Sequence, residues 1–204
     1  MSSLSALRDA VKSRIGNTTD DFDSLTDSFI NQALRKHGRR FRWKQLLVEN
    51  AQLTLTTGTE QYALPSNFWQ LVPGSVRWNV LSNSQGQPIK VVGIEGLEAY
   101  KTYNTQSSPY ACAVVSAASG GTKRLEFAPA FTQTNIVVEY DYFKTPTALA
   151  EDSDEPEIPE LEEVLIYEAL VGLSAKNNDS NLVSYYRDEL RQQLNVACQA
   201  FNGT

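Results

Sequence analysis

The chain has 204 residues and a formal net charge of −6, with one histidine and two cysteines. Its 41% hydrophobic and 21% charged residues are typical of a soluble globular protein that can bury a core without disulfides. Because His37 stands alone and Cys112 lies far from Cys198, the sequence excludes a two-histidine metal site and a CxxC motif. We therefore expect no metal and no other cofactor.

Targeting signals are not apparent in the sequence. The N-terminal segment has no apolar core of signal-peptide length, and no run of about 18 apolar residues occurs anywhere. We therefore expect no membrane partner. Two unmatched cysteines are typical of a reducing compartment, and we expect both thiols to be small buried hydrophobes.

Two helices are predicted near the N-terminus. The first covers residues 3–15, with Ser3 as its cap and Gly16 at its end. The second begins near Ser24, which we expect to cap it, and its buried face contains Phe29, Ile30, Ala33 and Leu34. Helical periodicity resumes at residues 43–47.

The hydrophobic period then changes to that of strands. Alternation around Leu53 and Tyr62, on either side of a turn, predicts a β-hairpin. In the clearest strand, 134–143, alternate residues share one face. The other predicted strands are 70–80, which Pro73 and Gly74 interrupt, 88–92, 110–118 and 123–128, and a short helix is expected at 95–103.

Helices return after an acidic, proline-rich loop at residues 145–159. They are expected at 160–175 and 179–202. Segregated helices and strands predict an α+β fold. We expect a helical bundle formed by residues 1–50 and 145–204, with an inserted antiparallel β domain at 51–144.

Charge is concentrated in two clusters. The basic patch has six cations and no acid: Arg35, Lys36, Arg39, Arg40, Arg42 and Lys44. The acidic belt has eight acids and no cation: Glu151, Asp152, Asp154, Glu155, Glu157, Glu160, Glu162 and Glu163. Outside the belt 16 acids remain against 18 Lys and Arg, so the rest of the chain is close to neutral.

These clusters have several interpretations. Both are ordinary solvated faces in the simplest one, since exposed ion pairs contribute only about 0–1 kcal/mol each. Alternatively, the clusters join neighbouring subunits head to tail, or the cations bind DNA phosphates. In the last case Phe41 and Trp43 would permit stacking on bases, but aromatic residues at this spacing more often belong to the core. The acid and proline density also predicts that the belt is a mobile arm that orders at an interface.

Catalytic motifs are missing from the sequence. It has no GxSxG elbow, Walker loop, GxGxxG or HExxH. Only the acidic belt offers paired carboxylates of the kind that hydrolyse glycosides. We expect His37, which lies among cations, to be an exposed surface group.

The order of several motifs resembles one known family. Arg40-Phe-Arg-Trp43 is followed by a segment from Leu53 to Trp69 that contains Tyr62-Ala-Leu-Pro65, and then by Val138-Glu-Tyr-Asp-Tyr-Phe-Lys-Thr-Pro146. Asp152-Ser-Asp-Glu-Pro-Glu-Ile-Pro159 precedes the last two helices. This plan, over nearly the whole chain, resembles the head-to-tail adaptor or connector proteins of short-tailed and related tailed bacteriophages.

The resemblance implies a structural virion protein at the head–tail junction that is not an enzyme and assembles in the host cytoplasm. Such adaptors form a ring of twelve identical subunits below the portal protein. They extend the channel through which phage DNA passes without specific binding, and they dock the next tail component. A carboxylate-based peptidoglycan hydrolase carried in the tail and a DNA-binding regulator remain as alternatives.

The candidate interface with the portal or a neighbouring subunit comprises both charge clusters. It contains the six cations of the basic patch and five acids of the belt: Glu151, Asp152, Asp154, Glu155 and Glu157. Charge reversal at Arg39 and Arg40 is expected to abolish ring assembly on the portal.

Overall fold

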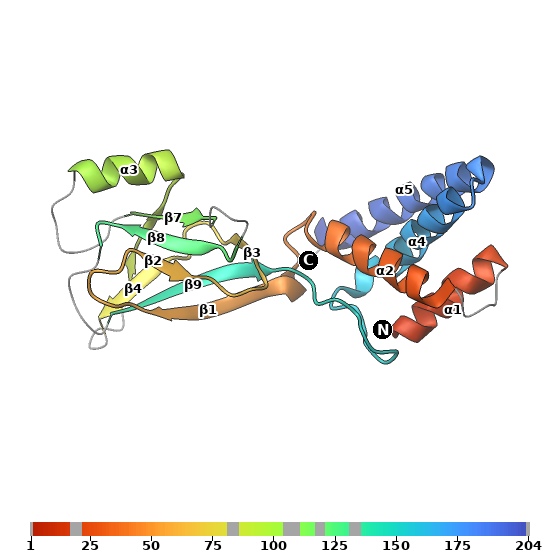
Figure 1. Ribbon diagram of the computed structural model, residues 1–204, viewed down its shortest axis with the longest axis horizontal. Helices are drawn as coiled ribbons and strands as arrows, with labels where there is room; N and C mark the ends of the chain where they lie inside the picture. The colour runs from red at the N-terminus through yellow and green to blue at the C-terminus, as the bar shows by residue number, and fades with distance from the viewer. Residues whose placement is uncertain are drawn as a thin grey trace. The chain divides into compact units, whose positions relative to one another are not determined.

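The computed structural model describes residues 2–16, 22–80, 86–103, 111–116, 121–130 and 136–202. The chain divides into two compact units. The helical unit comprises Met1–Leu46 and Thr145–Thr204, and the β unit comprises Leu47–Lys144 (Figure 1). The α+β prediction is confirmed, with helices and strands largely segregated along the chain.

The helical unit begins with two helices, α1 (Leu4–Ile15) and α2 (Asp23–Gly38). As predicted, the Ser3 hydroxyl caps α1 by accepting a hydrogen bond from the Ala6 amide at 3.3 Å. The helix ends at Gly16, whose φ of +71° is the left-handed conformation that glycine adopts without strain.

Helix α2 begins at Asp23, close to the predicted start, but the predicted Ser24 cap and the predicted helical stretch at residues 43–47 are wrong. Ser24 lies inside the first turn, and Phe22 occupies the cap position without a side-chain hydrogen bond. After α2 the chain forms only a short 3₁₀ turn, η2 (Lys44–Leu46). Leu47 then pairs with Phe143 in a β-sheet, and this pairing overrides the local helical period.

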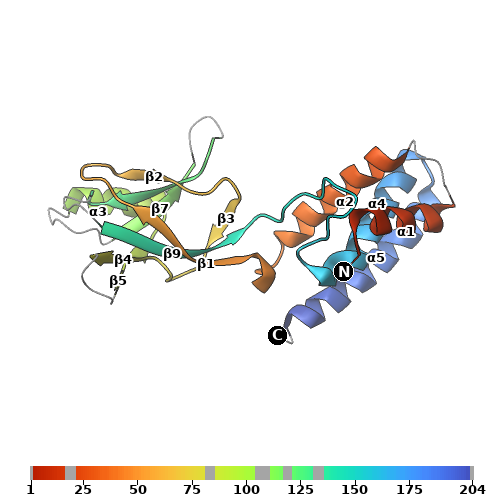
Figure 2. The ribbon, with the colours of Figure 1, turned by 90° about the horizontal axis from the view of Figure 1, so that it is seen from below.

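The C-terminal half of the helical unit consists of η3 (Pro159–Leu161), α4 (Glu162–Lys176) and α5 (Ser180–Asn202). Figure 2 shows α4 among α1, α2 and α5, and it packs against all three. Apolar residues therefore occur around much of α4, whereas α5 buries one stripe. The core includes Leu7, Val11, Ile30, Leu34, Trp43, Leu165, Ala169, Leu173 and Tyr186.

Strand β9 (Ile136–Lys144) is the central strand of the larger sheet. It pairs antiparallel with β1 (Leu47–Thr54), β3 (Phe68–Leu71) and β4 (Arg77–Val80), and β4 continues to β5 (Gln87–Pro88). The predicted alternation in β9 is confirmed, because Ile136, Val138, Tyr140 and Tyr142 share one face and are all buried.

The second sheet has the order β2–β8–β7–β6. Its strands are β2 (Gln61–Ala63), β8 (Arg124–Ala128), β7 (Ala111–Val115) and β6 (Lys90–Val91). The β6–β7 pair is parallel, which differs from the expectation of a purely antiparallel insertion. Side chains from both sheets form one core, and helix α3 (Ile94–Tyr103) packs on β7 and β8.

The predicted hairpin around residues 53–64 is wrong. Strands β1 and β2 are connected by a turn, in which the Tyr62 hydroxyl donates to the Thr56 carbonyl at 2.9 Å. The two strands nevertheless belong to different sheets. Each pairs instead with a distant strand, β9 or β8. Residues 110, 117–118 and 134–135 of the predicted strands lie outside the described residues.

Candidate functional site

The basic patch runs from the last turn of α2 into η2, and all six of its side chains are exposed. Lys36 Nζ lies 2.5 Å from Glu168 Oε1, and Arg39 donates to the Thr145 hydroxyl at 2.8 Å. In the part of the chain that the structure describes, Arg35, Arg42 and Lys44 have no side-chain partner. Half of the patch therefore has unused hydrogen-bond donors that face solvent.

The aromatic residues within the basic patch belong to the core. Trp43 is 2% exposed, and its ring centroid lies 5.6 Å from that of Phe41 and 5.4 Å from that of Phe201 at the end of α5. A buried indole cannot stack on a nucleotide base, so the proposed stacking role of Trp43 is wrong. The cluster instead attaches the α2–β1 connection to α5.

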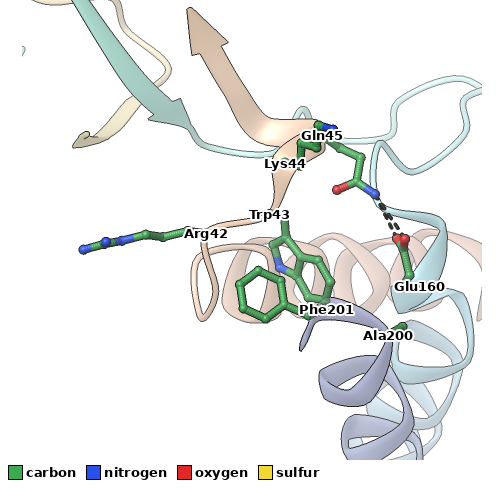
Figure 3. Close-up of a pocket in the computed structure, with 7 residues that line it drawn as sticks. All are labelled: Arg42, Trp43, Lys44, Gln45, Glu160, Ala200 and Phe201. Atoms are coloured by element: carbon green, nitrogen blue, oxygen red, sulfur yellow. Dashed lines mark hydrogen bonds between the residues drawn. The ribbon is translucent and has the colours of Figure 1, made fainter. Parts of the chain in front are cut away.

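A hollow of about 550 Å³ opens beside this aromatic cluster (Figure 3). Its wall combines Trp43 and Phe201 with the patch residues Arg42 and Lys44. Gln45 Nε2 closes one side by donating to the Glu160 carboxylate at 3.1 and 3.2 Å. The surface next to the patch is thus an apolar hollow rimmed by cations.

His37 is buried at 2% exposure, which corrects the expectation of a surface group. Its Nε2 lies 2.8 Å from Glu168 Oε2, and this hydrogen bond, opposed by burial and aided by Lys36, lowers the pKa of Glu168 to about 2. The sequence contains the signal for burial: His37 follows Ile30, Ala33 and Leu34 at helical spacing, on the apolar face.

The start of the acidic belt is anchored to α1, which favours an ordered segment over the expected mobile arm. The carbonyls of Asp152 and Asp154 accept hydrogen bonds from the amides of Ser5 and Leu4 at 3.1 and 2.7 Å. Arg8 adds an ion pair with Asp152 at 3.1 Å. The composition favoured disorder, but tertiary partners from the other end of the chain order the segment.

Two further contacts fix the same segment. The Asn31 carboxamide donates to the Leu149 carbonyl at 2.9 Å and accepts from the Leu149 amide at 2.8 Å. Asp154 Oδ2 accepts from the amides of Ala150 and Glu151 at 2.7 and 2.9 Å, which holds the pKa of Asp154 below its usual value. No local pattern marks Asn31, because its role depends on contact with Leu149, which is distant in the chain.

The acids of the belt do not neutralise the basic patch. Glu163 binds Arg14 through two oxygens at 2.9 and 3.1 Å, and Glu162 accepts from the Ser2 amide at 2.7 Å. Across the described residues, no ion pair joins the patch to the belt. The side chains of Glu151 and Glu155 are exposed and have no partner within the same described ranges. Both clusters therefore keep charge available for other molecules.

Within the acidic belt, Asp154 has a lowered pKa, whereas the general acid of a glycosidase needs a raised one. A search of the described residues finds no group of three or more His, Cys, Asp or Glu that could hold a metal ion. Within those same ranges, no helix has the length and apolar character needed to cross a membrane.

Comparison with known families identifies the type of protein. The model of the SU10 adaptor protein family matches residues 2–201. The chain belongs to this family. Among curated proteins, a search finds no match. The predicted resemblance is confirmed, and this SU10 adaptor is a structural head-to-tail adaptor of a bacteriophage virion.

Membership of the adaptor family also suggests what the two charge clusters contact. An SU10 adaptor works through contacts with other virion components and with further copies of itself. The exposed basic patch and the unpaired acids of the belt, Glu151 and Glu155, offer charged surfaces for such contacts.

Proposed function

We propose that this SU10 adaptor forms a ring of twelve identical subunits below the portal, extends the DNA channel and docks the next tail component. The observation that carries the proposal is the exposed basic patch, in which Arg35, Arg42 and Lys44 have no partner within the described residues. A cluster of six like charges repels itself, so an opposing acidic surface on another subunit or on the portal stabilises it.

Ring formation needs two different lateral surfaces on each subunit. A head-to-tail contact joins one surface of a copy to the other surface of its neighbour, and it closes into a ring when the rotation allows. The basic patch and the acidic belt are unlike surfaces of this kind. Anchoring of the belt by Arg8 and Asn31 keeps its acids in fixed positions, which favours a specific register.

The DNA channel sets a second requirement. Phage DNA has to leave the capsid without being held, and every Lys or Arg on the channel wall attracts phosphates. We therefore assign the basic patch to the portal or to a neighbouring subunit and not to the lumen. DNA then passes through the ring without specific binding.

Negative-stain electron microscopy of the protein mixed with portal particles tests the proposal. The wild-type chain should add a ring below the portal, and mass measurement should give twelve copies. The variant Arg39→Glu/Arg40→Glu should remain folded and lose this ring, whereas Lys90→Glu/Lys176→Glu, with the same change of charge at exposed sites outside the patch, should keep it.

The outcomes separate the two parts of the proposal. Portal particles that gain no density from the wild-type chain would contradict the ring itself. A normal ring built from the Arg39→Glu/Arg40→Glu chain would leave the ring in place and reject the role of the patch.

A further inference from the structure

A small basic groove lies between α5 and Arg40, which follows the end of α2. Three arginines line it, Arg40, Arg187 and Arg191, and no acid does. Leu190 and Leu194 provide apolar surface, and the volume is about 350 Å³, which holds a few side chains. The groove combines cations with an apolar floor, which suits a short acidic segment of a protein.

The guanidinium groups of the groove are largely unused. Arg187 has no side-chain partner among the described residues. Among the described residues Arg191 forms an ion pair only with Asp188, at 3.4 Å, and both side chains are more than 70% exposed, so the pair is weak. Arg40 lies over the Phe41 ring, 5.5 Å from its centroid, which leaves its N–H donors available. Guanidinium groups in this state bind carboxylates through paired hydrogen bonds.

The same chain presents a matching acidic turn at residues 151–155. The turn is closed by a hydrogen bond from the Asp154 amide to the Glu151 carbonyl at 2.9 Å. Asp152 is exposed but pairs with Arg8, and Asp154 accepts from amides of the turn itself, whereas the exposed side chains of Glu151 and Glu155 have no partner among the described residues. A turn that is already ordered loses little conformational entropy when it binds, which favours docking as a unit.

We propose that the acidic turn of one copy docks into the α5 groove of the neighbouring copy, with Glu151 and Glu155 facing Arg187 and Arg191. The pairing is absent within the described part of a single chain, so these charges remain for a second copy. The inference rests on the ring of the proposed function and names the contact that joins its subunits. It adds the α5 arginines, which lie outside the basic patch.

Charge reversal and charge exchange test the contact. Arg187→Glu/Arg191→Glu and Glu151→Lys/Glu155→Lys should each weaken ring assembly on the portal by about tenfold or more, because each places like charges face to face. A chain that carries all four substitutions restores opposite charges between copies and should recover assembly. Lys90→Glu/Lys176→Glu is the control for net charge, and circular dichroism verifies that every variant is folded.

Cys198 provides a second measurement that does not depend on charge. It lines the groove and is half-buried, whereas the other cysteine, Cys112, is fully buried with a pKa raised to about 12 by burial. A maleimide should therefore label Cys198 alone in the free folded chain. In the ring the docked turn covers Cys198, and labelling should slow by about tenfold or more.

Each result bears on one of the two proposals. Recovery by the exchanged chain together with protection of Cys198 supports the docking contact. Rings that leave Cys198 as reactive as in the free chain, or an exchanged chain that folds without assembling, would overturn the contact and leave the ring intact. Reversal variants that assemble normally but release DNA poorly would assign the arginines to DNA instead. Absence of any wild-type ring would remove both proposals.

Discussion

Replacement of Glu168 by Gln is expected to destabilise the helical unit in a manner that depends on pH. Glu168 on α4 joins two side chains of α2: the buried His37, at 2.8 Å, and Lys36, at 2.5 Å. Glutamine keeps the size of the side chain and one hydrogen bond but removes the negative charge. The change therefore isolates the electrostatic part of the α2–α4 contact.

The shifted pKa of Glu168 sets the magnitude. It falls from the ordinary 4.5 to about 2, mainly through the hydrogen bond to His37. Each pKa unit corresponds to about 1.4 kcal/mol, so the carboxylate contributes up to about 3 kcal/mol near neutral pH. Because the side chain keeps some contact with solvent, we expect Glu168→Gln to cost about 2 kcal/mol at pH 7. A lowered carboxyl pKa stabilises above pH 4.5, and this contribution is lost as the pH falls toward 2.

Urea denaturation at a series of pH values from 7 to 2.5, followed by circular dichroism at 222 nm, measures the effect. The free energy of unfolding of the wild type should approach that of Glu168→Gln below pH 4.5, by up to about 1.4 kcal/mol per pH unit. The control Glu155→Gln removes an exposed acid of the same unit and should change stability by less than about 0.5 kcal/mol. Equal stability of wild type and Glu168→Gln at pH 7, or a gap that stays constant down to pH 3, would refute the reasoning.

Three further substitutions test the packing of the helical unit. Trp43→Ala empties a buried site between Phe41 and Phe201 and should cost about 3–5 kcal/mol in urea denaturation; a cost below 1 kcal/mol would show that the cluster is not core. Gly38→Ala places a methyl group 2.3 Å from Pro146 Cγ and should cost about 1–3 kcal/mol. Addition of Pro146→Ala should restore part of that loss, and no restoration would reject the clash. Asn31→Ala leaves the Leu149 amide and carbonyl unpaired, so it should cost about 1–3 kcal/mol and speed exchange of that amide; unchanged exchange would contradict the anchoring of the belt.

Local patterns predicted many of the elements, because their signals lie within a few residues. The cap at Ser3 and the glycine at the end of α1 are adjacent to the helix they bound. The alternation in β9 follows from a period of two over a single strand. The α+β class follows from the order of such segments, and it required no knowledge of which strands pair.

Long-range partners explain the errors. Strand β1 pairs with β9, about 90 positions away in the chain, so the local hairpin signal around Leu53 and Tyr62 is misleading. The acidic belt is ordered by Arg8 and Asn31, which no composition rule connects to residues 149–154. The expectation for His37 is wrong for another reason: its neighbours in sequence are cations, but its position lies on the apolar face of α2.

The acids of the belt, which account for much of the net charge of −6, have two different roles. Acids such as Asp152 and Glu163 face arginines of α1 and hold the segment in place. Only after that anchoring do Glu151 and Glu155 occupy fixed positions at the surface. A free arm with the same composition would lose conformational entropy at every subunit contact, whereas the anchored turn has already lost it in folding. The paired acids therefore act on assembly indirectly, by ordering the segment that carries the unpaired ones.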